Sequence, residues 1–275
     1  MNKKQLIMEK ALELFANQGF EATSVQQITD YCGISKGAFY LSFKSKDELI
    51  IALIDHFMMQ IISDIDYIVN HTNDEQLLYE FYYMIYHSFH KHADFAKVLM
   101  KEQSQTLNKE LIIKMKYYDH LIESSILLMI NRLYGREVLH LKYDLMYCIK
   151  GFMNTYTHLF VFYNVPLDLK LLSESLAEKT NLLARHMTIP FVSKELLEIT
   201  EPLNDQITKE QILELIDPKI EEMDHSIEKE SLILLKQQLV EPTYNTAIVK
   251  GLIENIRNHP HCKWISYLLR TYYEF

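Results

Sequence analysis

The sequence predicts an all-α protein. Glycine and proline number only six each among 275 residues, so residues that end helices or form sharp turns are rare. Leu, Ile, Glu and Lys are abundant, and apolar residues recur every three or four positions over long segments, which is the period of an amphipathic helix. No segment alternates apolar and polar β-branched residues as a half-buried strand does. With 48% hydrophobic residues, the chain can bury a large core.

The first predicted helix covers residues 3–18. Its apolar residues fall on one side at helical spacing: Ile7, Ala11, Leu14 and Phe15. Gln18-Gly19 ends the helix, and we expect Phe20 to pack back against it. Lys3 and Lys4 either meet a phosphate or are simply solvated at the chain terminus.

The next segment, residues 24–43, predicts a helix, a tight turn and a second helix. Ser24 and Gln27 form a capping box at the start of the first helix, in which Ile28 and Tyr31 point inward. Gly33 permits the turn because glycine adopts a positive φ angle without a Cβ clash. Ser35 caps the second helix, which covers about residues 36–42. A further capping box, Ser45 with Glu48, opens a long helix at Lys46.

A helix pair joined by a short turn that contains glycine is a helix-turn-helix unit, whose second helix lies in the major groove of DNA. We expect Phe39 and Phe43, four residues apart, to face inward and hold this helix in place. Its exposed residues would then be Lys36, Gly37, Ala38, Tyr40 and Leu41. From spacing alone, an ordinary helical hairpin with charged ends explains the pattern equally well.

The string GISKGAFYLSFKSKDEL, together with ALELFANQGFEATSVQQIT before it, resembles the signature of the TetR family of bacterial transcriptional regulators. The resemblance covers roughly the first 50 residues and implies a dimeric, all-α, repressor-type protein with a variable C-terminal domain that usually binds a small ligand. Carried over by position, it implies that Lys36, Gly37, Ala38 and Tyr40 form the DNA-contacting face of the second helix. With the exposed Leu41 and the flanking residues, we predict the full set of DNA-contacting residues as Ser24, Val25, Lys36, Gly37, Ala38, Tyr40, Leu41, Ser42 and Lys46.

Two members of this set depend on particular arguments. Ser42 stands where the family often has histidine, so the phosphate contact predicted there depends on a hydroxyl in place of an imidazole. Lys46 matches a family lysine at the start of the fourth helix. A cation beside a helix N-terminus opposes the helix dipole but is well placed to meet a phosphate.

The charge distribution is compatible with DNA binding even though the net charge is −9. Residues 1–46 carry six lysines against four acidic residues, a balance of +2, so the remainder carries −11. A mildly basic N-terminal domain on an acidic body can bind DNA at one place and disfavours non-specific binding over the whole surface.

The long helix, about residues 46–70, extends beyond the DNA-binding unit. Leu49, Leu53, Phe57 and Ile61 recur every four residues along it. We hypothesise that it acts as a lever whose tilt sets the distance between the two DNA-binding units of a dimer. These units must lie about 34–36 Å apart to reach successive major grooves, so a ligand that changes the tilt would change DNA affinity.

The sequence predicts three domains: residues 1–62 for DNA binding, residues 63–190 for ligand binding and dimerisation, and residues 191–275 as an additional helical extension. The predicted helices of the middle domain cover about residues 75–92, 94–105, 109–134, 141–163 and 168–187. In the family, the last two helices commonly form a four-helix bundle with the partner subunit. The last helix offers Leu172, Leu176, Leu183 and Met187 for such an interface, or for a purely intramolecular core.

Two groups of residues are candidates for a ligand pocket. Lys150, Asn154 and His158 recur every four residues on one helix, where they either line a cavity or mark its solvent side. Aromatic residues crowd residues 75–92, and Phe81 and Phe89 either contribute to the pocket or belong to the core. We predict Phe81, Phe89, Asn154 and His158 as ligand-binding residues, and an apolar or amphipathic effector of unknown identity.

The extension contains four short helical stripes. One includes Ile212 and ends by Pro218, a second covers about residues 220–234, a third carries Ile248, Leu252 and Ile256, and the last carries Trp264, Leu268 and Tyr272. The extension caps the ligand domain, enlarges the dimer interface or binds another protein. The sequence does not choose among these roles.

Other classes of protein receive no support. Cys32, Cys148 and Cys262 are isolated, which suggests neither a disulfide framework nor a zinc site, and His87 with His90 has no matching further ligands. The N-terminus lacks the apolar run of a signal peptide, and the most apolar stretch, residues 143–163, is interrupted by polar residues and does not predict a membrane span. No cofactor is predicted, and the expected location is the cytoplasm.

The sequence therefore predicts a sequence-specific DNA-binding transcriptional regulator, a homodimeric repressor whose binding to a double-stranded operator is relieved by a small ligand. A helical protein–protein adaptor that has lost specific DNA binding is the alternative. An enzyme with a DNA-binding domain is a more remote alternative, since no P-loop, GxSxG, HExxH or glycine-rich dinucleotide motif is present. Mutation of Tyr40 and Lys46 would separate an adaptor from a regulator.

Overall fold

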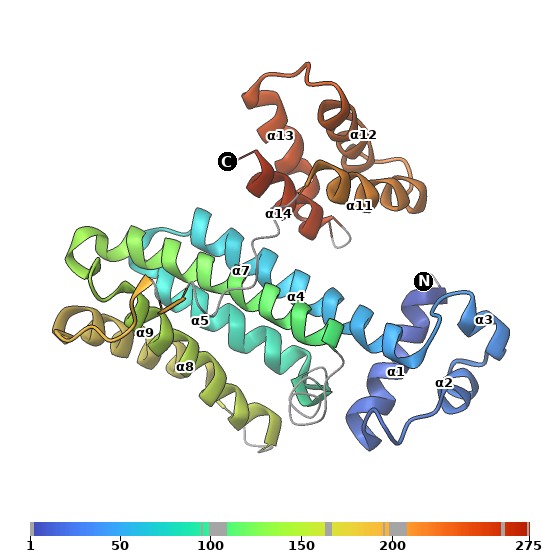
Figure 1. Cartoon of the computed structure of the whole chain (residues 1–275), viewed down its shortest axis with the longest axis horizontal. Helices are drawn as coiled ribbons and strands as arrows, with labels where there is room; N and C mark the ends of the chain where they lie inside the picture. Colours follow the sequence, from blue (N-terminus) through green and yellow to red (C-terminus); the bar gives the residue numbers. More distant parts are fainter. Residues whose placement is uncertain are drawn as a thin grey trace. The chain divides into compact units, whose positions relative to one another are not determined.

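The computed structural model describes residues 3–94, 96–98, 109–162, 167–194, 196–197, 208–259, 262–273 and 275. Every regular element in these ranges is a helix, so the predicted all-α fold class is confirmed (Figure 1). The chain divides into two compact units, Met1–Pro202 and Leu203–Phe275. The predicted domain boundaries at residues 62 and 190 stay predictions.

Three short helices form the N-terminal part of the first unit: α1 (Lys3–Gln18), α2 (Val25–Cys32) and α3 (Lys36–Tyr40). We refer to this three-helix part as the head. Gly19, with φ of 91°, ends α1 as the sequence predicts. Each of the three helices and the turn that follows them contributes buried apolar side chains: Ile7, Ala11, Phe15, Ile28, Phe39 and Phe43.

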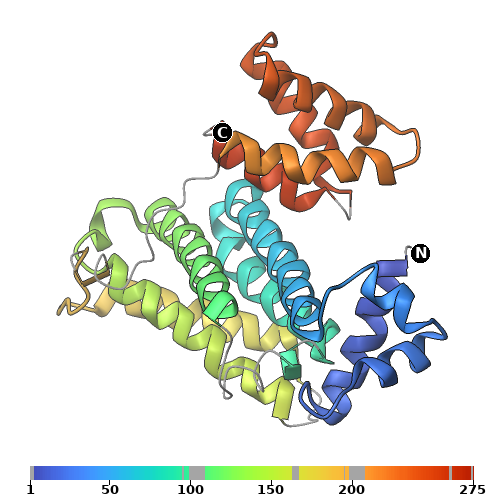
Figure 2. The same ribbon diagram turned by 45° about the vertical axis from the view of Figure 1, so that its right-hand side comes forward.

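Helix α4 (Lys46–His71) leaves the head and continues into the larger helical bundle, where it packs against α5 and α7 (Figure 2). Ser45 caps it by accepting a hydrogen bond from the Glu48 backbone N–H at 3.0 Å. The predicted capping box at this site is only half present. The Glu48 carboxylate accepts from the Lys44 N–H at 2.6 Å instead of from the cap residue itself.

The bundle consists of α5 (Asp74–Lys91), α7 (Lys109–Tyr134), α8 (Lys142–Phe162) and α9 (Leu169–His186), with a 3-10 turn at Gly135–Val138. These bounds agree with the sequence-based ranges to within one or two residues. Most of the helix predicted at 94–105 lies outside the described residues. Apolar side chains of α4, α5, α7, α8 and α9 share one core, so the lever helix and the bundle are packed as a single body.

Buried tyrosines join the helices of the bundle by hydrogen bonds. The hydroxyl groups of Tyr82 and Thr180 lie 2.7 Å apart, and the Tyr86 hydroxyl donates to the Phe152 carbonyl at 2.9 Å. The Tyr134 hydroxyl donates to the Asn181 side-chain oxygen at 2.8 Å. Each bond satisfies a polar group that would otherwise be buried at a cost of about 1–3 kcal/mol.

The leucine stripe proposed for dimerisation on α9 packs mainly inside its own subunit. Leu176 is fully buried, and Leu172 and Leu183 pack against the same core. The exposed leucines of this helix are Leu171 and Leu182. Leu172, Leu176 and Leu183 therefore follow the second expectation, an intramolecular core, because a helix with two apolar sides does not reveal from its sequence which side its own subunit covers.

The second unit is a small helical bundle of α11 (Lys209–Glu222), α12 (Ile227–Val240), α13 (Thr246–Arg257) and α14 (Lys263–Tyr272). Two predictions here were wrong. Helix α11 passes through Pro218 instead of ending before it, and residues 220–234 do not form one helix because the chain breaks between Met223 and Ser226. The hydroxyl of Ser226 then caps α12.

The face assigned to α13 was also displaced by one residue. The sequence pattern favoured Ile248, Leu252 and Ile256, whereas the buried residues are Val249, Ile253 and Ile256, and Ile248 is exposed. Apolar residues stand at adjacent positions of this helix, so periodicity alone is compatible with either face.

Candidate nucleic-acid interface

The α2–turn–α3 motif has the local geometry that its sequence predicts. Ser24 accepts a hydrogen bond from the Gln27 N–H at 3.2 Å, and the Gln27 side chain accepts from the Ser24 N–H at 2.8 Å, so the capping box is confirmed. Gly33 takes a left-handed conformation with φ of 67° and donates its N–H to the Asp30 carbonyl at 3.2 Å. A residue with a Cβ atom would be strained there.

One face of helix α3 is buried through Phe39, with Phe43 beside it, and we call this buried phenylalanine pair the floor of α3. The other face of the helix is exposed to solvent. Ser35 caps the helix by accepting from the Ala38 N–H at 3.2 Å. Phe39 and Phe43 are 0% and 1% exposed, so their predicted inward orientation is confirmed. Tyr40 is 53% exposed and Leu41 is 90% exposed, which is an unusual degree of exposure for large apolar side chains.

The structure brings the other predicted DNA-contacting residues into the same motif. Ser24, Lys36 and Gly37 are exposed, whereas Val25, Ala38 and Ser42 are half-buried. The Ser42 hydroxyl donates to the Ala38 carbonyl at 3.4 Å, a weak bond that an external acceptor can replace. These residues form a surface with polar, apolar and cationic groups, which suits contacts with base edges and phosphates together.

Tyr31 does not point inward as predicted. Its side chain is half exposed, and its hydroxyl donates to the Glu13 carboxylate at 2.5 Å. Lys10 also pairs with Glu13, at 2.9 Å, and lies over the Tyr31 ring. The hydrogen bonds from Tyr31 and then Lys10 lower the pKa of Glu13. A polar contact between α1 and α2 therefore replaces the expected apolar one.

Lys46, predicted to meet a phosphate, has internal partners in this structure. Its ammonium donates to the Phe20 carbonyl at 2.7 Å and to the Glu21 carbonyl at 3.4 Å. It also lies 4.2 Å from the centre of the Phe20 ring. The prediction of a phosphate contact is not tested by these contacts, but the lysine clearly has a second candidate role.

The lever helix is fastened to α7 beside the head. Asp55 of α4 accepts hydrogen bonds from the Tyr118 hydroxyl and the Lys114 ammonium, both at 2.7 Å. Tyr118 is almost fully buried, and burial followed by the charge of Asp55 raises the pKa of its hydroxyl. The neutral tyrosine thus remains a hydrogen-bond donor over the whole physiological range.

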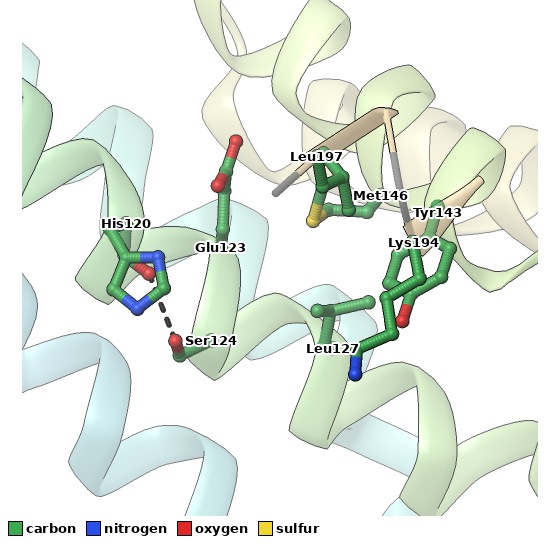
Figure 3. Close-up of a pocket in the computed structure, with 8 residues that line it drawn as sticks. All are labelled: His120, Glu123, Ser124, Leu127, Tyr143, Met146, Lys194 and Leu197. Carbon is green, nitrogen blue, oxygen red and sulfur yellow. Dashed lines mark hydrogen bonds between the residues drawn. The ribbon is translucent and has the colours of Figure 1, made fainter. Parts of the chain in front are cut away.

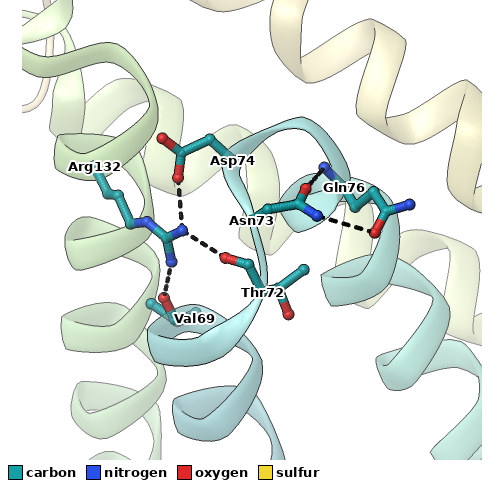
Figure 4. A network of polar contacts seen from close by, with 6 residues as sticks. All are labelled: Val69, Thr72, Asn73, Asp74, Gln76 and Arg132. Atoms are coloured by element: carbon teal, nitrogen blue, oxygen red, sulfur yellow. Dashed lines mark hydrogen bonds and ion pairs between the residues drawn. The ribbon is translucent and has the colours of Figure 1, made fainter.

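A second polar contact fastens the far end of the lever to the same helix (Figure 4). Arg132 of α7 donates to the Val69 carbonyl at 2.7 Å and to the Thr72 carbonyl at 2.5 Å, and it pairs with Asp74 at 2.6 Å. Carbonyls at a helix C-terminus lack intrahelical partners, and a cation there complements the helix dipole. Helix α7 therefore holds α4 at two places along its length.

A cavity of about 120 Å³ lies between α7, α8 and the segment that follows α9 (Figure 3). Its walls combine apolar side chains with ionisable and hydroxyl groups: His120, Glu123, Ser124, Leu127, Tyr143, Met146, Lys194 and Leu197. The covering segment is held by Asp144 of α8, whose carboxylate accepts from the N–H groups of Phe191 and Val192 at 3.1 to 3.3 Å.

None of the four predicted ligand-binding residues lines this cavity. Phe81 is fully buried in the bundle core, Phe89 packs against that core, and Asn154 and His158 are exposed on α8. Lys150, one turn before Asn154, pairs with Asp119 at 2.8 Å and with Glu123, so it ties α8 to α7. Those four residues stay predictions, and the structure does not gather them at one place.

Among the residues that the structure describes, no group of three or more His, Cys, Asp or Glu side chains is arranged to hold a metal ion. No helix in those ranges is both long and apolar enough to cross a bilayer.

The geometry of the head defines a helix-turn-helix protein, and comparison with known proteins agrees with it. Residues 7–53 match the sequence model described as "Bacterial regulatory proteins, tetR family". Two helix-turn-helix-type transcriptional regulators of Bacillus subtilis strain 168, both described as uncharacterised, are similar along 92% of this chain. YerO is 29% identical with 89% of its length covered, and YuxN is 28% identical with 91% covered.

A solved transcriptional regulator of the TetR/AcrR family from Aquifex aeolicus VF5 has the same fold, with a TM-score of 0.52 and 25% identity. Two thirds of this chain, 66%, covers 99% of that protein. The chain is therefore a DNA-binding transcriptional regulator, and its residues 7–53 match the TetR family. Similarity to YerO along 92% of the chain is too long to fit within residues 1–202, so that relative also shares part of the second unit.

Proposed function

We propose that the protein is a homodimeric, cytoplasmic repressor that binds a double-stranded DNA operator through α3. The exposed face of α3 on its buried phenylalanine floor carries this proposal. Lys36, Gly37, Ala38, Tyr40 and Leu41 would face base edges in the major groove, while Ser24, Val25 and Ser42 would contact the backbone. Occupation of a promoter by the dimer is sufficient to repress, and no catalytic step is part of this function.

The exposed side chains of α8 and α9 support a dimer interface. Tyr147 and Leu159 on α8 and Leu171 and Leu182 on α9 remain exposed in the single chain. Such side chains on adjacent helices are suited to burial against a second copy. Sedimentation should give twice the chain mass of 32.7 kDa, and Leu171→Glu with Leu182→Glu should give the monomer.

We propose that the cavity beside α7 receives the effector, a small amphipathic molecule. Leu127, Met146 and Leu197 provide an apolar wall, and Lys194 and His120 are suited to the acidic group of such a molecule. Since α7 lines the cavity and is tied to α4 through Asp55 and Arg132, a shift of α7 would change the tilt of the lever.

A release assay tests the effector proposal. The fluorescent operator duplex is bound first, and straight-chain carboxylates from hexanoate to palmitate are then added. We expect one chain length to release the DNA, and we expect Leu127→Trp, which fills the cavity, to bind DNA normally but resist release. Equal release from both proteins would place the effector elsewhere, and no release by any member of the series would remove amphipathic carboxylates as the effector class.

A further inference from the structure

The ammonium of Lys46 occupies a well-formed acceptor site within the head. Lys46 is the first residue of α4, and its hydrogen bonds reach back to the carbonyls of Phe20 and Glu21, 26 and 25 residues earlier. The Phe20 ring lies beneath the charge at 4.2 Å and itself packs edge-on against Phe15, with ring centres 5.2 Å apart. Two carbonyls and one ring face thus surround a half-buried cation.

The turn that accepts these bonds connects α1 to α2, and Thr23 holds it too, partly by accepting a hydrogen bond from the Gln18 side chain at 3.0 Å. The Thr23 hydroxyl donates to the Gly19 carbonyl at 2.7 Å, and the Thr23 N–H donates to the Phe20 carbonyl at 3.1 Å. With Lys46 as a second donor, the Phe20 carbonyl uses both of its lone pairs. The lever helix is thereby joined directly to the turn that begins the helix-turn-helix motif.

Two other lysines of the head lie in a different environment. Lys36 and Lys44 are exposed, and neither side chain has a hydrogen-bond or ion-pair partner in the described part of the chain. The backbone of Lys44 is fixed, because its N–H donates to the Glu48 carboxylate at 2.6 Å and the next residue caps α4. The backbone of Lys44 is thus ordered before binding and its ammonium is open to a phosphate, so that only the side chain itself must be ordered on contact.

We propose that Lys46 is a positioning residue that locks the head onto the lever helix, and that Lys44 supplies the phosphate charge. The proposal rests on the DNA-binding function of the head. In this arrangement a change in the tilt of α4 moves the Lys46 ammonium, which moves the α1–α2 turn bonded to it. The turn then shifts α2 and α3. The alternative role of Lys46, a direct phosphate contact, makes a different prediction about salt dependence.

The test compares Lys46→Met with Lys44→Met in the full-length protein. Methionine keeps an apolar stem over Phe20 but cannot donate. We expect Lys46→Met to lower operator affinity about tenfold with an unchanged salt slope, comparable to the net loss of one hydrogen bond to a charged group. We expect Lys44→Met to reduce the slope of log affinity against log salt by about 0.9, the value for one lost phosphate contact.

Backbone amide exchange in the DNA-free protein supplies the second readout. Exchange at residues 20–23 should accelerate in Lys46→Met and remain at the wild-type rate in Lys44→Met, and Lys46→Arg should restore most of the protection. A slope reduced by about 0.9 in Lys46→Met, with unchanged amide exchange, would overturn the proposal in favour of a phosphate contact. An unchanged affinity would also overturn it.

A measurement on the wild-type protein covers the case in which Lys46→Met does not fold. The 15N-labelled lysine ammonium of Lys46 should show scalar coupling to the Phe20 carbonyl carbon, both free and bound to DNA. Coupling to phosphorus in the complex, in place of the carbonyl, would contradict the positioning role. Because the free-protein spectrum requires no DNA, failure of this proposal and failure of specific DNA binding are recorded separately.

Discussion

The head and the helical bundle of the first unit differ in the exposure of their side chains: the α3 face of the head leaves large and charged side chains exposed, whereas the bundle pairs its tyrosine hydroxyls by hydrogen bonds. In the head, Tyr40 and Leu41 lie exposed on a floor of buried phenylalanines, and the Lys36 side chain has no partner among the described residues. In the bundle, the hydroxyls of Tyr82, Tyr86, Tyr118 and Tyr134 each have a partner on another helix. Across the described residues, no buried side-chain nitrogen or oxygen lacks a hydrogen bond.

The difference indicates how each region meets its ligand. The head offers groups that are already exposed, so a DNA duplex can be bound with little internal rearrangement. The bundle offers groups that are already paired, so the proposed effector would have to exchange internal hydrogen bonds for new ones. Under that proposal the exchange would move helices, and α7 and α4 share polar contacts at Asp55 and Arg132. The bundle is therefore suited to a change of conformation, and the head to direct contact with DNA.

The largest expected effect comes from removing the floor beneath α3. Phe39→Ala leaves a cavity under a five-residue helix and should destabilise the head by about 3–5 kcal/mol, a typical cost for truncating a buried phenylalanine. Urea unfolding followed by amide exchange in residues 24–43 measures this loss. Phe39→Leu is the matched control and should lower the free energy of unfolding much less. Equal losses of stability in the two variants would show that Phe39 is not closely packed.

Tyr40→Ala should act on recognition and not on stability. The side chain is exposed, so unfolding should change by less than about 0.5 kcal/mol, whereas discrimination between operator and random DNA should fall by about 1–3 kcal/mol, as for a lost base contact. Titration of both duplexes by fluorescence anisotropy checks this. An equal loss on both duplexes would mean that Tyr40 contacts the backbone and does not read bases.

Tyr86→Phe tests the opposite behaviour in the bundle. Loss of the hydroxyl leaves the Phe152 carbonyl without this donor and should reduce stability by about 1 kcal/mol while leaving operator affinity unchanged. Tyr83→Phe is a suitable control because Tyr83 is half-buried on the same helix and its hydroxyl forms no described hydrogen bond. Thermal unfolding of the two variants should separate them, and identical melting would contradict the assigned contribution of the Tyr86 bond.

The smallest effect concerns alkaline pH. Burial raises the pKa of Tyr134 to about 12, from a usual value near 10.0. Between these values the unfolded chain has lost a proton that the folded chain keeps, so the stability contributed below pH 10 falls as the pH rises toward 12. Tyr134→Phe should show a shallower loss of stability over this interval. Parallel curves for wild type and variant would show that the hydroxyl titrates normally.

The sequence predicts the head well because its signals are local. The Ser24 capping box, the Gly33 turn and the inward pair Phe39 and Phe43 each depend on residues a few positions apart. Tyr31 was the exception, since its position depends on Glu13 of another helix. Contacts between distant segments leave no trace in a local pattern.

The same reason explains what the sequence did not reveal in the bundle. Asp55 and Tyr118 are 63 residues apart, and Arg132 and Val69 are also 63 apart, so no spacing rule pairs them. Polar residues at helical spacing suggested a pocket at Asn154 and His158, yet these side chains are exposed. Asp55 stands between apolar residues of a long predicted helix, and this pattern indicates a buried polar contact without identifying its partner.

The most direct test of DNA reading by α3 starts from the whole genome. Fragments of genomic DNA are selected on the purified protein, and the enriched duplex is compared with its scrambled version by fluorescence anisotropy at several salt concentrations. We predict a preference of at least about 10³, typical of specific helix-turn-helix dimers, which Tyr40→Ala should reduce. Failure of any fragment to enrich, with weak and equal binding to the two duplexes, would contradict specific reading and favour an adaptor that has lost its operator.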